Sequence, residues 1–214
     1  MSQRAKPFLV FGLPRSRTAW LSHFLAPRPG AVGHDTGIDC KSIGDFIGQF
    51  YGRDRLAGTC ETGAMMAWRV IKHRMPEAKL VVIQRPVGDV AFSLGRCGLF
   101  PGLLELEHRK TYLEAISRLE GTKTLSFQQL ERKDVCEHLY EFCNGEQAPE
   151  GRWEYFADFN IQVDMQKRMQ KLKANAEAIA GLKASVMREV AMISAGEPCR
   201  LKHQRRFSGF LLQP

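Results

Sequence analysis

Two short segments of this chain combine an apolar run with a turn that carries cationic and hydroxyl side chains. The first runs from Gly12 to Trp20, and its turn contains Pro14, Arg15, Ser16, Arg17, Thr18 and Ala19. The second runs from Lys79 to Ser93 and places Arg85 eight residues before Ser93. An apolar strand, a turn and a helix start in this order aim backbone N–H groups and cationic side chains at one point, where an anion binds. Two such points predict a ligand with two separated phosphates.

The first segment differs from the P-loop of nucleoside triphosphatases, which reads G-x-x-x-x-G-K-[ST]. Counting from Gly12, Arg17, Thr18 and Ala19 stand where that motif has glycine, lysine and serine or threonine. The lysine for the β- and γ-phosphates and the hydroxyl for Mg²⁺ are therefore missing, which argues against an ATPase, a GTPase or an ordinary kinase. The residues present suit one tetrahedral anion, held by backbone N–H groups, by two hydroxyls and by the guanidinium of Arg15.

The first segment resembles the donor-binding loop of the P-loop-like sulfotransferases, which commonly reads Y-P-[KR]-[ST]-G-T-[TS]-[WL]. The chain matches this loop at Pro14, Arg15, Ser16, Thr18 and Trp20. It departs from the loop at Arg17, which replaces the glycine, and at Ala19, which replaces a threonine. The glycine lets such a loop wrap a phosphate tightly, so its replacement leaves open a non-catalytic nucleotide-binding or assembly protein that kept the phosphate loops.

The second segment resembles the 3′-phosphate motif of the same family, R-[ND]-P-x-D-x-x-x-S. Arg85, Asp89 and Ser93 hold its spacing, and Pro86 directly follows Arg85. The resemblance covers roughly residues 7 to 145. It implies a transfer of a sulfuryl group from 3′-phosphoadenosine 5′-phosphosulfate, the cosubstrate, to a hydroxyl or amine of an acceptor that the sequence does not identify.

The resemblance also implies a role for each matched residue. Arg15 would contact the bridging or 5′-phosphate oxygen, the stretch from Ser16 to Thr18 would cradle the 5′-phosphate, and Trp20 would stack on adenine. Arg85 and Ser93 would bind the 3′-phosphate. No metal is required, and no cluster of carboxylates or histidines has the spacing of a metal site.

The acceptor must lose a proton, so a base is expected at the end of a neighbouring strand. Gly33-His34-Asp35-Thr36 is similar to the G-E-E-T segment of tyrosylprotein sulfotransferases, whose second acidic residue is the catalytic base. This likeness favours Asp35, the intrinsic pKa of imidazole favours His34, and Glu61 at the next strand end is a third candidate. Each also has a structural interpretation, as a loop histidine or as a helix-capping or turn carboxylate.

Alternating strands and helices predict an open, mainly parallel α/β sheet flanked by helices, with its ligand beyond the carboxyl ends of the strands. Continuous apolar runs, typical of strands buried on both faces, are 8–11, 31–33, 57–60, 80–83 and 124–127. Helical patterns lie between them at 18–25, 43–51, 64–74, 87–94, 103–119 and 135–143. We expect a sulfotransferase-like domain over residues 1–160.

Residues 161–214 are expected to form a long basic helix and a tail. Apolar residues recur at steps of three and four from Met165 to Ile193, which predicts one helix of about 28 residues and about 42 Å. Gly181 is expected to mark a bend. This helix is predicted either to pack along its own domain or to form a homodimer. Ten Lys or Arg against four Asp or Glu lie between positions 164 and 206, but without interleaved aromatic residues they argue against nucleic-acid binding.

The composition is that of a globular protein, with 44% hydrophobic and 25% charged residues. The apolar run after Lys6 is too short for a signal peptide, and no stretch predicts a membrane span. Six scattered cysteines without a C-x-x-C pair indicate reduced thiols. These features predict a cytoplasmic protein.

Overall fold

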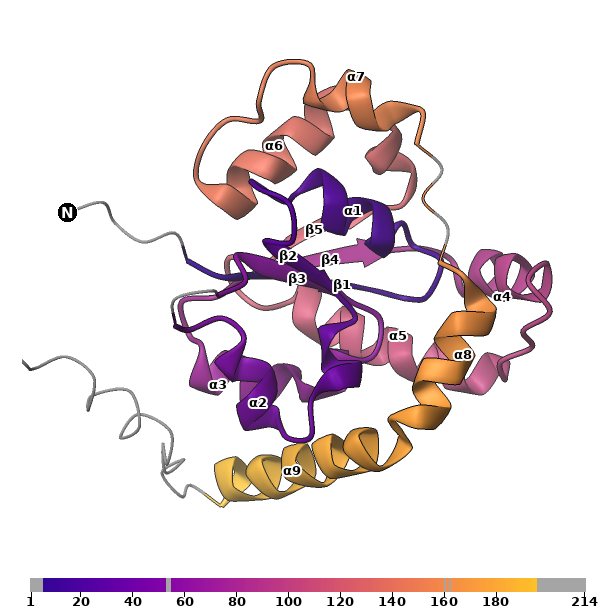
Figure 1. The fold of residues 1–214 in the computed structure, drawn as a ribbon. Helices are drawn as coiled ribbons and strands as arrows, with labels where there is room; N and C mark the ends of the chain where they lie inside the picture. Colours follow the sequence, from indigo (N-terminus) through magenta and orange to yellow (C-terminus); the bar gives the residue numbers. More distant parts are fainter. Residues whose placement is uncertain (1–5, 53–54, 160, 162, 196–214) are drawn as a thin grey trace, which may run out of the picture.

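A parallel sheet of five strands forms the centre of the structure, a computed structural model that describes residues 6–52, 55–159, 161 and 163–195 (Figure 1). The strands are β1 (Phe8–Gly12), β2 (Val32–His34), β3 (Gly58–Glu61), β4 (Lys79–Gln84) and β5 (Lys123–Ser126). Their order across the sheet is β2-β3-β1-β4-β5, and every neighbouring pair is parallel. The predicted α/β class is confirmed.

Alternate side chains of the central strands enter two separate apolar cores. Leu9 and Phe11 of β1 lie in one core, and Phe8 and Val10 lie in the other. All five residues of β1 are buried, which is why the sequence shows a continuous apolar run at this strand instead of an alternating one.

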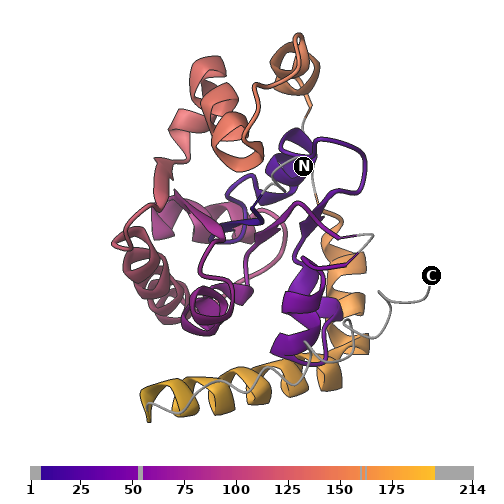
Figure 2. The ribbon, with the colours of Figure 1, turned by 90° about the vertical axis from the view of Figure 1, so that its left-hand side faces the viewer.

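Helices cover both faces of the sheet (Figures 1 and 2). The face of Leu9 and Phe11 is covered by α2 (Ile43–Gly48), α3 (Trp68–Arg74), α4 (Val87–Gly95), α5 (Leu103–Ser117) and α9 (Ala176–Ser194). The opposite face is covered by α1 (Thr18–Phe24), α6 (Lys133–Asn144) and α7 (Arg152–Ala157). Single 3₁₀ turns follow three strands: η1 (Thr36–Asp39), η2 (Ala64–Ala67) and η3 (Gln128–Glu131).

The chain leaves β1 and β4 toward opposite faces of the sheet. Helix α1 follows β1 on one face, whereas α4 follows β4 on the other. Because β1 and β4 are neighbours in the sheet, the two loops diverge and open a crevice beyond the carboxyl ends of these strands. Open α/β sheets bind their ligands at such a switch point, and both anion-binding segments of the sequence end there.

The predicted long C-terminal helix is confirmed as α9, but it does not run unbroken from residue 165: the segment forms two helices, α8 (Met165–Ala174) and α9, separated at Asn175. The side chain of Asn175 binds the carbonyl oxygen of Ile38 and the carboxylate of Asp39. The bend is therefore at Asn175 and not at Gly181, which lies inside α9. A Cβ atom on Gly181 would come within 2.8 Å of the carbonyl oxygen of Lys41, so this glycine permits a close approach of the helix to the α2 segment.

Helix α9 packs on the same core as the sheet. Its buried Val186 belongs to the core cluster of Leu9 and Phe11. The hydroxyl of Ser185 accepts the backbone N–H of Ile43 at 2.8 Å, and Glu189 forms a half-buried ion pair with Arg74 at 3.0 Å. Part of the apolar stripe thus faces the chain's own domain. The homodimer stays a prediction, and residues 196–214 of the predicted tail lie outside the described residues.

Candidate active site

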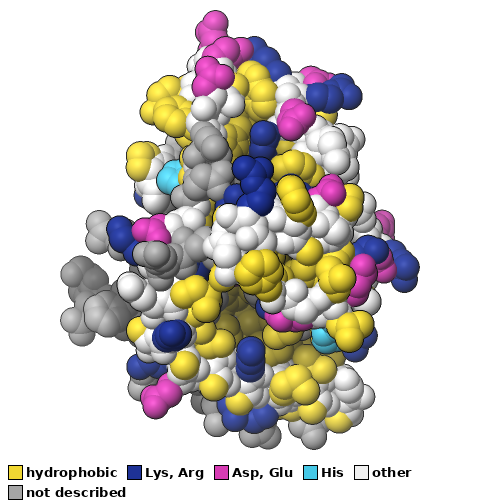
Figure 3. Space-filling view, turned by 90° about the vertical axis from the view of Figure 1, so that its right-hand side faces the viewer, with side chains coloured by type: hydrophobic (Ala, Val, Ile, Leu, Met, Phe, Trp, Pro, Cys, Tyr) yellow, Lys and Arg dark blue, Asp and Glu magenta, His cyan; other side chains and the backbone are white. Residues whose placement is uncertain are grey.

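A cavity of about 410 Å³ lies at the carboxyl ends of the strands. Figure 3 shows this end of the molecule, where Lys and Arg side chains gather near the middle between apolar surfaces. The lining comes from the loop after β1 and from the ends of β2, β3, β4 and β5, closed by the segment between α7 and α8. Its charged members are Arg15, Arg17, Asp35, Arg85, Asp158 and Arg168. The guanidinium groups outnumber the carboxylates, so the charge of the lining favours an anionic ligand.

The loop after β1 holds two arginines in left-handed backbone conformations. Arg15 has φ 65° and Arg17 has φ 58°. Arg17 therefore keeps the glycine-like backbone of the motif although it carries a side chain, at a cost of about 1–2 kcal/mol. The cost is offset by contacts: the Arg17 guanidinium donates to the carbonyl oxygen of Leu130 at 3.0 Å and lies 3.9 Å from Glu131. Arg17 is thus compatible with an anion-binding turn.

The first turn of α1 begins directly after this loop. No side chain caps it, so its first backbone N–H groups have no intrahelical partner. Thr18, Ala19 and Trp20 carry these groups, and all three residues line the cavity. The turn therefore presents donors to a bound anion beside Arg15.

The two anion-binding segments meet in one cluster. Nε of Arg15 donates to Oγ of Ser93 at 3.1 Å, and the guanidinium of Arg85 donates to the carbonyl oxygen of Arg15. Ser93 accepts in this contact and keeps its own O–H for a ligand. The Arg85 guanidinium lies 4.1 Å from the centre of the Phe127 ring, so Arg85 is held in place by the loop and by an aromatic face. Burial lowers the pKa of Arg85 from its ordinary value.

Two of the predicted donor contacts are corrected by the structure. The Trp20 ring is 4% exposed, stacks on Phe24 at 4.8 Å and donates its N–H to the carbonyl oxygen of Phe156. It is packed in an aromatic cluster and leaves little ring surface for adenine. Ser16 is fully buried, lies outside the cavity lining and has a hydroxyl without a partner among the described residues. Its side chain points under the loop, against Gly12.

Apolar lining residues that the sequence did not indicate form a further part of the cavity wall. They are Leu94, Phe127, Ala157, Phe159, Ile161 and Val163. Phe159 follows α7 and is 48% exposed, so it presents a ring that Trp20 does not. Leu94 and Phe127 had a weak signal in the sequence, as the last residues of a predicted helix and of a predicted strand, whereas the segment after α7 carries no recognisable motif.

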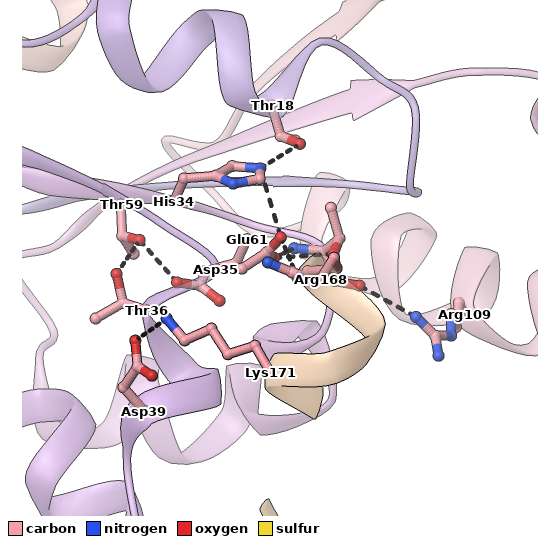
Figure 4. Close-up of polar contacts among 11 residues, drawn as sticks. Thr18, His34, Asp35, Thr36, Asp39, Thr59, Glu61, Arg109, Arg168 and Lys171 are labelled. Carbon is pink, nitrogen blue, oxygen red and sulfur yellow. Dashed lines mark hydrogen bonds and ion pairs between the residues drawn. The ribbon is translucent and has the colours of Figure 1, made fainter. Parts of the chain in front are cut away.

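The imidazole of His34 lies in the cavity at the end of β2. Its Nε2 atom is 3.2 Å from Oγ1 of Thr18 and 3.4 Å from the carboxylate of Asp35 (Figure 4). Burial lowers the pKa of His34 below its ordinary value of 6.5, and Asp35 opposes this effect while Arg168 adds to it. The imidazole is therefore neutral at pH 7 and has one ring nitrogen able to accept a proton.

The carboxylate of Asp35 is already saturated with donors. One oxygen accepts the backbone N–H of Thr62 at 2.6 Å and its hydroxyl at 2.8 Å, and the other accepts from Arg168 at 2.5 Å. Asp35 is 4% exposed and has a left-handed backbone with φ 50°. These contacts occupy both oxygens of the carboxylate, so the structure argues against Asp35 as the base that takes the acceptor's proton.

Glu61 lies deeper, at the end of β3. It is 1% exposed and does not line the cavity. Oγ1 of Thr59 is 2.7 Å from its carboxyl group, which also lies against the turn at Gly37. Burial, with Asp35 nearby, raises the pKa of Glu61 to about 8. A buried carboxyl with these partners does not reach an acceptor, which corrects its assignment as a base candidate.

Arg168 is a site residue that sequence reasoning missed. It reaches the cavity from α8 and pairs with Asp35 (Figure 4). Lys171, one turn further, pairs with Asp39 at 2.7 Å and ties the same helix to η1. The basic pattern of this segment gave a general signal, but not which of its arginines faces the site.

Among residues 6–52, 55–159, 161 and 163–195, no group of three or more His, Cys, Asp or Glu side chains could hold a metal ion. The described cysteines are free thiols. None of the described helices combines the length and the hydropathy needed to cross a membrane.

No protein-family model matches the chain, and no curated protein is significantly similar to it in sequence. Solved structures with some likeness include a sulfotransferase from Alicyclobacillus acidocaldarius, at 18% identity and TM-score 0.44 over 86% of this chain and 97% of that chain. Mouse sulfotransferase SULT7A1 complexed with PAP has 12% identity and TM-score 0.47 over 82% and 67% of the two chains. A gluconokinase from Sinorhizobium meliloti 1021 has 14% identity and TM-score 0.43 over 73% and 100%. Likenesses with TM-scores below 0.5 do not establish an activity, so the function is argued from the site itself.

Proposed function

We propose that this protein transfers a sulfuryl group from 3′-phosphoadenosine 5′-phosphosulfate to a hydroxyl or amine of an acceptor. The observation that carries the proposal is the cluster of Arg15, Arg85 and Ser93, in which two segments about 70 residues apart along the chain meet in one cavity. A nucleotide with phosphates on both its 3′ and 5′ positions matches two cationic segments better than a triphosphate does, because the P-loop lysine and the Mg²⁺-binding hydroxyl are missing.

Different residues of the cavity bind different parts of the donor. The N–H groups of the first α1 turn and the guanidinium of Arg15 hold the 5′-phosphate side. Arg85 and the free O–H of Ser93 hold the 3′-phosphate. Phe159 provides the aromatic surface for adenine that the packed ring of Trp20 does not.

In the transfer step the bond between sulfur and the bridging phosphate oxygen breaks, and a bond forms between sulfur and the acceptor oxygen or nitrogen. Charge builds on the leaving phosphate oxygen, where Arg15 stabilises it more strongly in the transition state than in the ground state. The acceptor's proton passes to a base. Such a loose in-line transfer depends mainly on positioning and on electrostatic stabilisation, as in phosphoryl transfer.

His34 is the base that fits this step best. It is a cavity residue, its imidazole is neutral at pH 7 because burial lowers its pKa, and a neutral imidazole accepts a proton without first losing one. Asp35 is occupied by Thr62 and Arg168, and Glu61 lies outside the lining. Both carboxyl groups are left with supporting roles.

The test is turnover of the donor in the presence of pooled acceptors, which include phenols, alcohols, amines, sugars and tyrosine peptides. Release of adenosine 3′,5′-bisphosphate that depends on an acceptor, and that falls by about 10²–10⁴-fold in His34→Ala, is expected. Tight binding of the bisphosphate without turnover on any acceptor would instead favour a non-catalytic nucleotide-binding protein. Neither binding nor turnover would refute both.

A further inference from the structure

The ends of β2 and β3 are joined by a reciprocal pair of carboxyl contacts. Asp35, after β2, accepts from the backbone N–H and the hydroxyl of Thr62, after β3. Glu61, at the end of β3, lies against the turn after β2, where a Cβ atom on Gly37 would be 3.6 Å from an oxygen of its carboxyl group. Each strand end thus places a carboxyl group against the loop that follows the other. We call these contacts the carboxyl clamp.

Two more contacts run beside the clamp. The backbone N–H of Asp35 donates to the carbonyl oxygen of Cys60 at 2.9 Å, and the hydroxyls of Thr36 and Thr59 lie 2.8 Å apart. Thr59 in turn lies 2.7 Å from Glu61. Figure 4 shows these groups converging directly below His34. The clamp therefore fixes the backbone that carries this imidazole, including the left-handed turn at Asp35.

We propose that Glu61 is a positioning residue which, through the carboxyl clamp, sets the orientation and burial of His34 without touching a substrate. The inference rests on the proposed role of His34 as the base. Its geometric basis is independent of that role, because Glu61 is buried, does not line the cavity, lies against Gly37 and is linked to Thr36 through the hydroxyl of Thr59.

The neighbours of Glu61 favour the neutral, protonated form of its carboxyl group. The titratable groups around it are Asp35, whose charge is matched by Arg168 from α8, and the thiol of Cys40, whose pKa burial raises to about 12. A second carboxylate charge beside Asp35 is unfavourable in this buried place, and the pKa of Glu61 rises to about 8 accordingly. A neutral carboxyl group keeps the contact with the hydroxyl of Thr59, because it can both accept and donate a hydrogen bond.

This protonation state gives an informative pair of variants. The amide in Glu61→Gln imitates the neutral acid, since it keeps the contact with the hydroxyl of Thr59 either as donor or as acceptor. Glu61→Ala removes this contact and leaves the buried hydroxyl of Thr59 with Thr36 alone. Thr62→Val weakens the other half of the clamp more mildly. Glu189→Gln is the matched control, because it breaks the half-buried Arg74 pair on α9 and leaves the clamp intact.

The readout is the pKa of His34, measured by an NMR titration of the imidazole C–H signals, which needs no activity. We expect the pKa to stay below 6.5 in the unmodified protein, in Glu61→Gln and in Glu189→Gln, and to rise toward 6.5 in Glu61→Ala and Thr62→Val as water reaches the ring. If Glu61→Ala does not fold, Thr59→Val, which removes the hydroxyl between Glu61 and Thr36, provides the same comparison. An unchanged pKa in the variants that break the clamp, or an equal change in Glu189→Gln, would overturn the proposal.

A second readout separates positioning from plain stability. Because the folded pKa of Glu61 lies above its ordinary value of 4.5, its contribution to stability is present below pH 4.5 and is lost as the pH rises toward 8. The melting temperature of Glu61→Gln, relative to that of the unmodified protein, should therefore rise as the pH increases over this range. A parallel pH dependence of the two melting temperatures would contradict the inference. Bisphosphate affinity is expected to change less than about threefold in every variant. If the proposed function is wrong, the unmodified protein does not bind the bisphosphate, and this result is distinct from a failure of the clamp.

Discussion

The most informative substitution at the donor site is Arg85→Ala. In the structure Arg85 has two roles that a mutant can separate: it donates to the carbonyl oxygen of Arg15 and so holds the loop, and it presents a cationic face beside Ser93. If it binds the 3′-phosphate, its loss affects only ligands that carry this group. If it holds the loop, its loss affects every nucleotide.

The size of the effect follows from the type of contact. A hydrogen bond to a charged group contributes about 1.5–3 kcal/mol, which corresponds to about 10–150-fold in the dissociation constant. The guanidinium is partly buried over Phe127, so screening by water is reduced and a loss within this range is expected. Arg85→Lys should recover only part of the loss, because an ammonium group does not reproduce the planar stacking on Phe127.

The assay is calorimetric titration with adenosine 3′,5′-bisphosphate and with adenosine 5′-monophosphate. Arg85→Ala is expected to weaken the bisphosphate by about 10–150-fold and the monophosphate by less than about threefold. Arg69→Ala is the matched control, since Arg69 is exposed and also lies over an aromatic ring, that of Trp68, and it should leave both affinities unchanged. An equal loss for both nucleotides in Arg85→Ala would refute the 3′-phosphate assignment.

Three further predictions concern the chemical step. Arg15→Ala should lower turnover by about 10²–10³-fold while changing donor affinity much less, because Arg15 acts on charge that develops only in the transition state. Steady-state kinetics will measure turnover and calorimetry will measure donor affinity, and equal losses in both would contradict this role. Asp35→Asn should keep bisphosphate affinity and lower turnover less than His34→Ala does; a larger loss in Asp35→Asn would return the role of base to Asp35. Because burial lowers the pKa of His34 below 6.5, the unfolded chain binds a proton at this residue at a higher pH than the folded protein does. The free energy of unfolding should therefore decrease as the pH drops through 6.5. His34→Gln should make this pH dependence less steep in denaturant titrations, and an unchanged slope would contradict the burial of a neutral imidazole.

The sequence was sufficient to predict the central sheet, because its strands are buried on both faces and therefore appear in the sequence as continuous apolar runs. The predicted strands lie within one residue of the observed ends, as at β2, predicted at 31–33 and found at Val32–His34. The spacing of Arg85 and Ser93 was also readable, because both positions belong to one turn and one helix. Local patterns of this kind depend on neighbours in the chain.

The parts that could not be predicted depend on contacts between distant segments. Arg168 meets Asp35 across 133 residues, and a basic helical stripe does not tell which arginine faces a partner. Trp20 matches the donor motif by type and position, but its ring packs against Phe24 and against Trp153, which belongs to a segment that carries no motif. The helix break at Asn175 likewise follows from hydrogen bonds to η1, and single-chain periodicity does not reveal such partners.

The central claim is that one cavity recognises a nucleotide through two separate phosphates. The most direct measurement is the comparison of three dissociation constants for the unmodified protein, those of adenosine 3′,5′-bisphosphate, adenosine 5′-monophosphate and ATP with Mg²⁺. Binding of the bisphosphate at least about tenfold tighter than either of the others is expected, because only it engages both the Arg15 and the Arg85 segments with charged groups. Equal affinities for the three, or no binding of the bisphosphate, would contradict the account.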